Sequence, residues 1–323
     1  MKRTYLVGFV VFVFLISACS HETFEPLPKN SSIISTVNIK DMTISFYDMD
    51  QQKKLEDWDV NRPYTGGIIF PDDDTILLYG KTIETTDLYS LSKGGKIGSW
   101  ETGKGIVNAL LILEGNEIAL ADQERDSIRF FSLDGKEIKE VKSEREPLTL
   151  LEAESERRLY AISFNHKTLS IIDLNTKENL PGFQIHSAAA GALLSQQKGE
   201  LWIGGHGVGS KAEERIHVYD SETGELKKEI SAPVMPVNFV KYDNHIFVLS
   251  HGSNMLYKLN RHGEKKGAIK VGANPFEIEL FQNKLIIAGY DSNDLYIVNP
   301  DSLLIEKTVN VGKGPFQIVT RES

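Results

Sequence analysis

Three of the eight histidines in this sequence, His186, His206 and His251, lie in turn-rich segments where an imidazole could do chemistry. A neutral imidazole binds transition metals and exchanges protons near neutral pH, so grouped histidines suit a metal site or acid–base catalysis. His206 and His251 occupy related places, in Gly-Gly-His206-Gly and Leu-Ser-His251-Gly. No two of the three have the local spacing of a metal site, so we predict no metal ion and no other cofactor. We interpret all three as polar loop residues of a ligand-binding face.

The glycine-rich segment 204–214 is the second candidate for chemistry. Its alternating glycines suggest a phosphate loop, but a dinucleotide-binding fingerprint needs glycine where this chain has Ser210. A P-loop needs the order Gly-Lys-Ser, whereas Lys211 follows the serine here. We therefore predict a flexible recognition loop, with Lys211 as a candidate ligand-binding residue.

Sequence motifs for hydrolytic catalysis are absent. The chain contains neither a Gly-x-Ser-x-Gly elbow nor a His-Glu-x-x-His run, and its single cysteine excludes a metal site built from several cysteines. The acidic run 71–74 suits a turn better than a cation site, because aspartates stabilise turns through their side chains. We predict no catalytic residue.

A repeated unit determines where these candidate residues lie. A short apolar strand ending in Asp, Asn or Ser recurs seven times, and successive copies end 44, 40, 41, 47, 40 and 39 residues apart. The copies span residues 44–48, 88–92, 128–132, 169–173, 216–220, 256–260 and 295–299. The longest step contains the segment 204–214, and insertions on one face of a repeat array often mark its binding face.

Each unit contains four short strands separated by Gly, Pro, Asn and Asp turns, and no stretch after Cys19 has a helical period of helix length. Four strands in a unit of about 40 to 45 residues is typical of a β-propeller. The chain ends with one strand, 315–320, and the repeats begin with only three. We therefore predict an all-β, seven-bladed β-propeller over residues 33–323, closed by pairing of the C-terminal strand with the N-terminal blade.

The last two units carry the clearest motif, with Gly272-Ala-Asn-Pro-Phe followed by Ser292-Asn-Asp-Leu-Tyr-Ile-Val-Asn299. These residues resemble the YVTN-type repeat of bacterial β-propellers, which reads approximately G-x-x-P-x-x-hydrophobic and then S-N-x-hydrophobic-x-V-I-D. The middle units match it only in outline. The resemblance implies that ligands meet the loops at one end of the central channel, where His186, His206 and His251 are expected. It implies no particular activity.

The amino terminus predicts export. Lys2 and Arg3 precede an uncharged apolar run over residues 6–16, as in a secretory signal peptide. That run is 11 residues long, well short of the roughly 20 that a membrane-spanning helix needs. We therefore predict a signal peptide over residues 1–18 rather than a permanent transmembrane anchor.

Ile16-Ser-Ala-Cys19 resembles the lipobox of bacterial lipoproteins, whose cysteine receives a diacylglycerol and becomes the first residue after cleavage. The resemblance implies that Cys19 is lipidated, and residues 19–32, which contain two prolines, are expected to form an extended tether. The alternative is an ordinary cleaved signal peptide that leaves a free thiol.

The net charge of −9 argues against a large basic surface, so we expect no nucleic-acid partner. We predict a lipid-anchored, extracytoplasmic binding platform that holds a protein, a cell-envelope polymer or a small ligand. We expect it to be located at the outer leaflet of the cell membrane, or at the outer membrane if the cell has two membranes. The alternative is an enzyme, a lyase or a cofactor-dependent oxidoreductase, whose site lies at the channel mouth.

Overall fold

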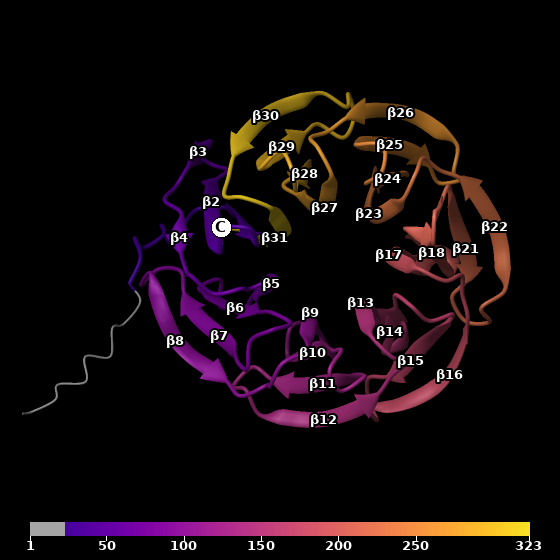
Figure 1. Ribbon diagram of the computed structural model, residues 1–323, viewed down its shortest axis with the longest axis horizontal. Helices are drawn as coiled ribbons and strands as arrows, with labels where there is room; N and C mark the ends of the chain where they lie inside the picture. The colour runs from indigo at the N-terminus through magenta and orange to yellow at the C-terminus, as the bar shows by residue number, and fades with distance from the viewer. Residues whose placement is uncertain (1–22) are drawn as a thin grey trace, which may run out of the picture.

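The computed structural model describes residues 23–323 as seven antiparallel blades arranged around a central axis (Figure 1). This confirms the predicted all-β, seven-bladed propeller. Helical structure in these residues consists of two single 3-10 turns, Glu154–Glu156 and Gln196–Lys198. Among the same residues no helix is long and apolar enough to cross a membrane. The predictions for Cys19 and for the signal peptide fall outside the described residues.

Each blade is built from the axis outward, and its strands follow one another along the chain. Blades 2 to 4 consist of β5 (Gly66–Ile69), β6 (Thr75–Tyr79), β7 (Thr86–Ser90), β8 (Gly95–Trp100), β9 (Ile106–Ile112), β10 (Glu117–Asp122), β11 (Ser127–Ser132), β12 (Glu137–Lys142), β13 (Pro147–Ala153), β14 (Arg158–Ser163), β15 (Thr168–Asp173) and β16 (Glu178–Gln184). Blades 5 to 7 consist of β17 (Ala189–Ser195), β18 (Glu200–Gly205), β21 (Arg215–Asp220), β22 (Leu226–Ser231), β23 (Pro236–Tyr242), β24 (His245–Ser250), β25 (Met255–Asn260), β26 (Lys265–Lys270), β27 (Pro275–Phe281), β28 (Lys284–Gly289), β29 (Asp294–Val298) and β30 (Ile305–Asn310).

Blade 1 joins the two ends of the propeller. Its innermost strand is the last of the chain, β31 (Pro315–Arg321), which pairs antiparallel with β1 (Ile33–Asn38), and β1 pairs with β2 (Thr43–Asp48). Arg321 donates hydrogen bonds to the carbonyl oxygens of Pro28 and Ser31, so the closing strand is held by its side chain as well as by the ladder. The outer part of blade 1 is two short strands, β3 (Lys53–Lys54) and β4 (Trp58–Asp59), where the repeat predicts a single outer strand.

The core lies between neighbouring blades rather than inside any one of them. One cluster packs Leu77 and Tyr79 of blade 2 against Ile118 and Leu120 of blade 3, and all four are buried. Burying such a side chain contributes about 1.5 to 3 kcal/mol. Because a blade hides its faces only against its neighbours, the ring must close before every core cluster is complete.

The inner strands of six blades carry a β-bulge near their first residue. The pairing register shifts there, and the extra residues are Val107, Leu148, Ala190 with Gly191, Val237, Phe276 and Phe316. A bulge redirects side chains and bends the strand. The bulges therefore aim a set of residues at one end of the central channel.

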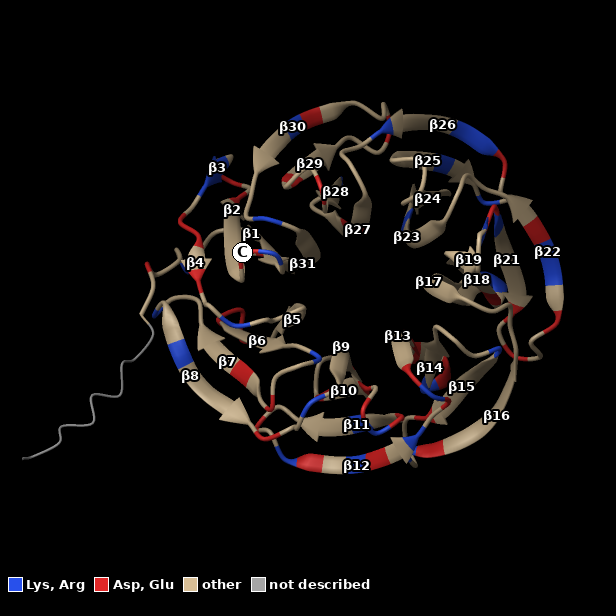
Figure 2. Cartoon of the chain, viewed as in Figure 1, with Lys and Arg blue, Asp and Glu red and all other residues tan. Residues whose placement is uncertain are grey.

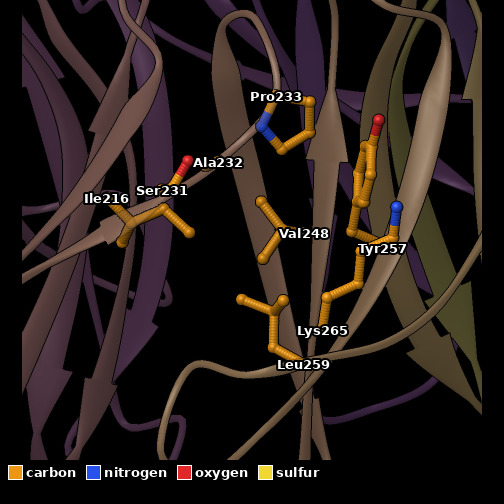
Figure 3. A pocket seen from close by; sticks show the side chains of 8 residues that line it. All are labelled: Ile216, Ser231, Ala232, Pro233, Val248, Tyr257, Leu259 and Lys265. Atoms are coloured by element: carbon orange, nitrogen blue, oxygen red, sulfur yellow. The ribbon is translucent and has the colours of Figure 1, made fainter.

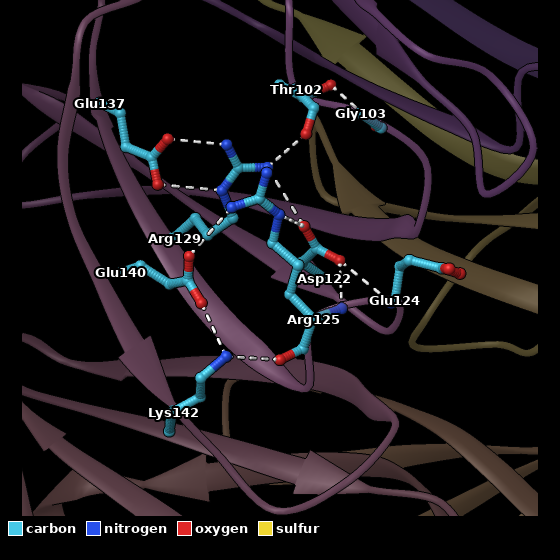
Figure 4. A network of polar contacts seen from close by, with 9 residues as sticks. All are labelled: Thr102, Gly103, Asp122, Glu124, Arg125, Arg129, Glu137, Glu140 and Lys142. Atoms are coloured by element: carbon cyan, nitrogen blue, oxygen red, sulfur yellow. Dashed lines mark hydrogen bonds and ion pairs between the residues drawn. The ribbon is translucent and has the colours of Figure 1, made fainter.

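A buried arginine ties blade 3 to the segment that precedes it (Figure 4). The Arg129 guanidinium, 2% exposed, holds Glu137 through two bonds of 2.7 and 3.0 Å and Asp122 through one of 3.1 Å. It also donates to the carbonyl of Thr102, which lies between β8 and β9. Since each nitrogen of the guanidinium has an acceptor, we interpret this network as structural support.

Charged residues are frequent on three of the outer strands, where β12, β22 and β26 carry lysine together with, in β12 and β22, glutamate (Figure 2). The described part of the predicted tether packs against the propeller. Phe24 stacks on Trp58 with ring centroids 5.1 Å apart, and Leu27 is 4% exposed. These two apolar side chains explain why residues 23–32 lie on the surface of blades 1 and 2.

Candidate functional site

The candidate site is the end of the propeller that carries the loops between second and third strands and the segments leading into inner strands; we call this the loop face. Backbone hydrogen bonds join the two kinds of loop within a blade. The amide of His206 bonds the carbonyl of Ala188, that of His251 bonds Met235, and that of Tyr290 bonds Asn274. These bonds hold the two kinds of loop together in blades 5, 6 and 7.

A row of rings crosses the loop face of five consecutive blades; we call Phe164, His206, His251, Phe276 and Phe316 the ring row. The ring centroids lie 5.5 Å apart for Phe164 and His206 and 5.4 Å apart for His206 and His251. They lie 5.9 Å apart for His251 and Phe276 and 4.4 Å apart for Phe276 and Phe316. All five side chains are partly exposed.

The ring row combines two local devices. Phe276 and Phe316 are the bulge residues of β27 and β31, which follow Pro275 and Pro315 in the repeated Pro-Phe motif. His206 and His251 come from the loops that follow the second strands of blades 5 and 6. The structure thus places two of the three predicted histidines in ring contact.

Both histidines of the ring row are neutral at pH 7, so each imidazole has one nitrogen that can donate a hydrogen bond and one that can accept a hydrogen bond. Burial lowers the pKa of His206 and of His251, and for His206 the neighbouring His251 lowers the pKa further. The Nδ1 atoms of both are buried and have no hydrogen-bond partner among residues 23–323. The ring row therefore offers apolar ring faces together with two partly exposed, neutral imidazoles.

The row ends at blade 1 beside a charged pair. Tyr290 contacts Phe316 with centroids 6.4 Å apart, and the Lys40 ammonium lies 4.1 Å above the Tyr290 ring. Lys40 also forms a 2.7 Å ion pair with Asp291. Because each charge has a partner, this end of the row is polar without strong net charge.

His186, the third predicted histidine, belongs to a different group at the outer part of blade 5; we call His186, Glu213 and His217 the rim cluster. The His186 and His217 rings stack with centroids 4.0 Å apart and an interplanar angle of 22°. Glu213 Oε2 lies 3.7 Å from Nε2 of His217. One nitrogen or oxygen from each of the three lies within 4.8 Å of the other two.

Two further side chains orient the imidazoles of the rim cluster. Glu229 Oε1 lies 3.3 Å from Nδ1 of His217, and the Tyr219 hydroxyl lies 3.4 Å from Nδ1 of His186. Burial, and after it the neighbouring His217, lowers the pKa of His186 to about 4. His186 is therefore neutral at pH 7, with a lone pair available on one ring nitrogen.

The insertion 204–214 connects the two groups. It forms a small hairpin of β19 (Gly207–Val208) and β20 (Lys211–Ala212), and then the amide of Glu213 bonds the carbonyl of His206. Lys211, the other residue predicted from sequence, lies exposed on this hairpin. The hairpin carries Glu213 to the rim cluster and holds His206 in the ring row.

Sequence reasoning missed Glu213 and His217. Their spacing of four residues was only a weak signal for a metal site. His217 lies in the middle of a repeated strand, where the alternation of apolar residues indicated a structural role instead. Its contact with His186 depends on the path of the connection between blades 4 and 5.

Sequence reasoning also missed two carboxyl groups on β27, Glu277 and Glu279. Glu277 accepts a 2.9 Å hydrogen bond from the side-chain amide of Asn238 on the neighbouring β23. Burial, and after it the nearby Glu279, raises the pKa of Glu277 to about 8, and burial raises the pKa of Glu279 to about 7. Such carboxyl groups could exchange protons at neutral pH.

An apolar cleft of about 280 Å³ lies between the outer strands of blades 5 and 6 (Figure 3). Figure 3 shows its lining, Ile216, Ser231, Ala232, Pro233, Val248, Tyr257, Leu259 and Lys265. Lys265 covers the ring of Tyr257 at 4.9 Å. None of the sequence-predicted site residues lines this cleft, and we assign it no role.

The sequence matches no known protein family and no curated protein. Solved structures are nevertheless similar over most of their length. A protein from Desulfotomaculum acetoxidans is 11% identical with a TM-score of 0.71, over 90% of this chain and 99% of that one. AztD from Citrobacter koseri is 12% identical with a TM-score of 0.62, over 90% and 97%.

The dihydro-heme d1 dehydrogenase NirN, solved in complex with DHE, is 11% identical with a TM-score of 0.67, over 94% of this chain and 78% of that one. At these identities the similarity concerns the fold and not the sites. The chain is a β-propeller whose function has to be argued from its own loop face.

Proposed function

We propose that this protein is a lipid-anchored, extracytoplasmic binding protein that holds its ligand on the ring row. The observation that supports this is the continuity of the row, in which rings from five blades follow one another at 4.4 to 5.9 Å. Isolated aromatic residues on a surface need no explanation, but a contiguous partly exposed set is typical of a binding site.

The chemistry of the ring row favours a ligand with apolar faces and hydroxyl groups. Ring faces contact apolar surface, whereas the partly exposed imidazoles of His206 and His251 can bond hydroxyls. The acidic chain and the paired charges of Lys40 and Asp291 disfavour a polyanion. Among a protein, an envelope polymer and a small ligand, an envelope polymer built of sugars fits this combination best.

Replacing both Phe276 and Phe316 by alanine should remove most of the binding. We expect retention of the full chain on insoluble envelope polysaccharide to fall about tenfold or more, since truncating central aromatic contacts commonly costs 1 to 4 kcal/mol each. Cosedimentation of detergent-solubilised protein with purified, protein-free polysaccharide measures this.

The matched control is Leu304→Ala, which removes another apolar side chain, 65% exposed, away from the row. It should leave retention unchanged. Equal retention of the double variant and the parent would contradict the proposed site. Binding that disappears when protein is removed from the polysaccharide would instead identify a protein partner and overturn the assignment of a sugar polymer.

The anchor is tested separately through Cys19. Cys19→Ala should shift the protein from the detergent-dependent membrane fraction to the soluble extracytoplasmic fraction, because the acyl chains contribute about 0.8 kcal/mol per buried CH₂. Fractionation with and without detergent measures the shift. Cys19→Ala protein that still requires detergent for extraction would refute lipid anchoring, whatever the ring row binds.

An enzyme with its site at the channel mouth is the second candidate. The observation that favours it is the pair Glu277 and Glu279, whose pKa values of about 8 and about 7 suit general acid–base catalysis. If the protein is a cofactor-dependent oxidoreductase, the natively purified protein should show the absorption spectrum of a bound chromophore. This measurement distinguishes an oxidoreductase from a binding protein.

A further inference from the structure

We propose that the rim cluster is a binding site for Zn²⁺, with His186, His217 and Glu213 as its ligands. The inference goes beyond the binding of a ligand on the ring row and does not depend on it. Within residues 23–323 these are the one group of three histidine, cysteine or acidic side chains whose ligand atoms converge within 4.8 Å.

The unsatisfied nitrogens of the rim cluster are the first support. The Nε2 atoms of His186 and His217 are both buried and have no hydrogen-bond partner among the described residues. Burying a polar atom without a partner costs about 1 to 3 kcal/mol, so such atoms in a folded protein call for an explanation. A metal ion between the two imidazoles and the carboxylate would supply a partner for both nitrogens.

The second support is the pair of side chains that hold the other ring nitrogen of each histidine ligand. A histidine that binds a metal usually has its other ring nitrogen held by a carboxylate or another oxygen, which fixes the ring and its tautomer. Glu229 Oε1 is placed in this way 3.3 Å from Nδ1 of His217, and the Tyr219 hydroxyl 3.4 Å from Nδ1 of His186. Both imidazoles therefore have Nε2 left for a metal.

The ligand set identifies the class of metal. Two imidazoles and one carboxylate suit Zn²⁺ and disfavour Ca²⁺ and Mg²⁺, which prefer oxygen ligands. In a tetrahedral zinc site neighbouring ligand atoms are about 3.4 Å apart, since the bonds are about 2.0 to 2.2 Å. The present spacing, within 4.8 Å, and the stacking of the two rings at 22° require an inward movement of about an ångström and a rotation of one imidazole, because each ring binds a metal in its own plane.

Rotation of the ligand side chains can provide that movement. The amides of Glu214 and Arg215 hold Oε1 of Glu213, which leaves its Oε2, 3.7 Å from Nε2 of His217, for a metal ion. With three protein ligands the fourth position stays open to water or to a ligand donor atom. Zinc would also join the hairpin to β21 and to the connection that carries His186.

The full chain, purified in detergent and stripped with a chelator, should bind one Zn²⁺ per molecule in a calorimetric titration. Co²⁺ should occupy the same site and give the visible absorption of a tetrahedral ion. Glu213→Gln and His186→Ala should each weaken Zn²⁺ binding about 100-fold, and Glu229→Gln about ten- to 100-fold. Zn²⁺ should also slow proteolytic cleavage within residues 207–212.

The matched control is His166→Ala, which removes an imidazole from a different histidine–glutamate pair, with His166 Nδ1 3.4 Å from Glu144 Oε2. It should leave zinc affinity and stoichiometry unchanged. Failure to bind Zn²⁺ or Co²⁺, or a titration unaffected by Glu213→Gln, would overturn the proposal. Glu213 lies in the hairpin, so this variant tests the site even if replacement of the buried His217 prevents folding.

Discussion

A chain that ends at Gly314 should fail to form the propeller, because the deletion removes the whole of β31. The strand contributes a six-residue pairing with β1 and the buried side chains of Ile318 and Val319. At about 1 kcal/mol per hydrogen bond and 1.5 to 3 kcal/mol per buried apolar side chain, this loss is comparable to the 5 to 15 kcal/mol that stabilises a typical domain.

Deletion of β31 also removes contacts on its other side. Gln317 accepts a 2.7 Å hydrogen bond from the amide of Gly67 in blade 2, and Arg321 holds the segment at Pro28 and Ser31. Without the strand, blade 1 presents an unpaired inner edge, which promotes aggregation. The expected result is loss of the cooperative thermal transition seen by circular dichroism, with most of the protein insoluble.

The matched control for the β31 deletion removes only Glu322 and Ser323, which lie beyond the strand. It should change the unfolding free energy by no more than about 1 kcal/mol, the worth of one or two exposed hydrogen bonds. A peptide of residues 315–323 added to the truncated chain should restore part of the transition. A soluble truncated chain with the parent's melting temperature would show that ring closure is dispensable.

The second large effect concerns pH and the Glu277 carboxyl group. Its pKa of about 8 in the folded protein is well above the usual value for glutamate, so the folded state binds more protons than the unfolded state between these two values. The unfolding free energy must then fall as the pH rises through this interval. We expect the unfolding free energy to fall by about 4 kcal/mol between pH 5 and pH 9 through this group.

Glu277→Gln should remove that loss. The variant keeps an oxygen that can accept the hydrogen bond from Asn238 but cannot ionise next to Glu279. It should resemble the parent at pH 5 and exceed its unfolding free energy by about 4 kcal/mol at pH 9. Urea unfolding at both pH values measures the difference. Glu277 also raises the pKa of Tyr79 in part, and the hydroxyl of Tyr79 donates a hydrogen bond to Gln317.

Glu222→Gln, in an exposed turn of blade 5, is the control and should leave the pH dependence of stability as in the parent. Glu279→Gln should reduce the loss in part, because Glu279 is the second cause of the raised pKa of Glu277. The unfolding free energies of the parent and of Glu277→Gln could fall by the same amount between pH 5 and pH 9. That result would contradict a protonated Glu277 carboxyl group in the folded protein at neutral pH.

The architecture could be predicted because the strand pattern repeats at a regular interval along the sequence. Seven copies of one strand pattern, with one strand left at the C-terminus and three at the start, determine both the blade number and the closure by β31. The outer strand of blade 1 could not be predicted in detail. Leu55, between β3 and β4, still bonds the carbonyl of Phe46, but the ladder is interrupted around it.

The candidate site was predictable only where it follows the repeat. His206 and His251 occupy equivalent places in blades 5 and 6, and they lie in contact. His186 and His217 are not equivalent positions, and their contact depends on how one connection crosses the rim of blade 5. Glu277 carried no signal, because its raised pKa comes from burial by neighbouring inner strands.

The packing of residues 23–27 on the propeller has a consequence for its orientation. Thr23 bridges to Gly95 at the start of β8, and Phe24 is fixed on Trp58, so the chain is attached to one side of the ring from that point. Thr23 is four positions after Cys19, and extended chain spans at most about 3.6 Å per residue. With Cys19 acylated as proposed, the edge of blades 1 and 2 stays within about 15 Å of the lipid surface. The propeller would then remain close to the bilayer, because its connection to the anchor is short. The largest distance from the bilayer at which it could bind a partner would be set by the diameter of the ring.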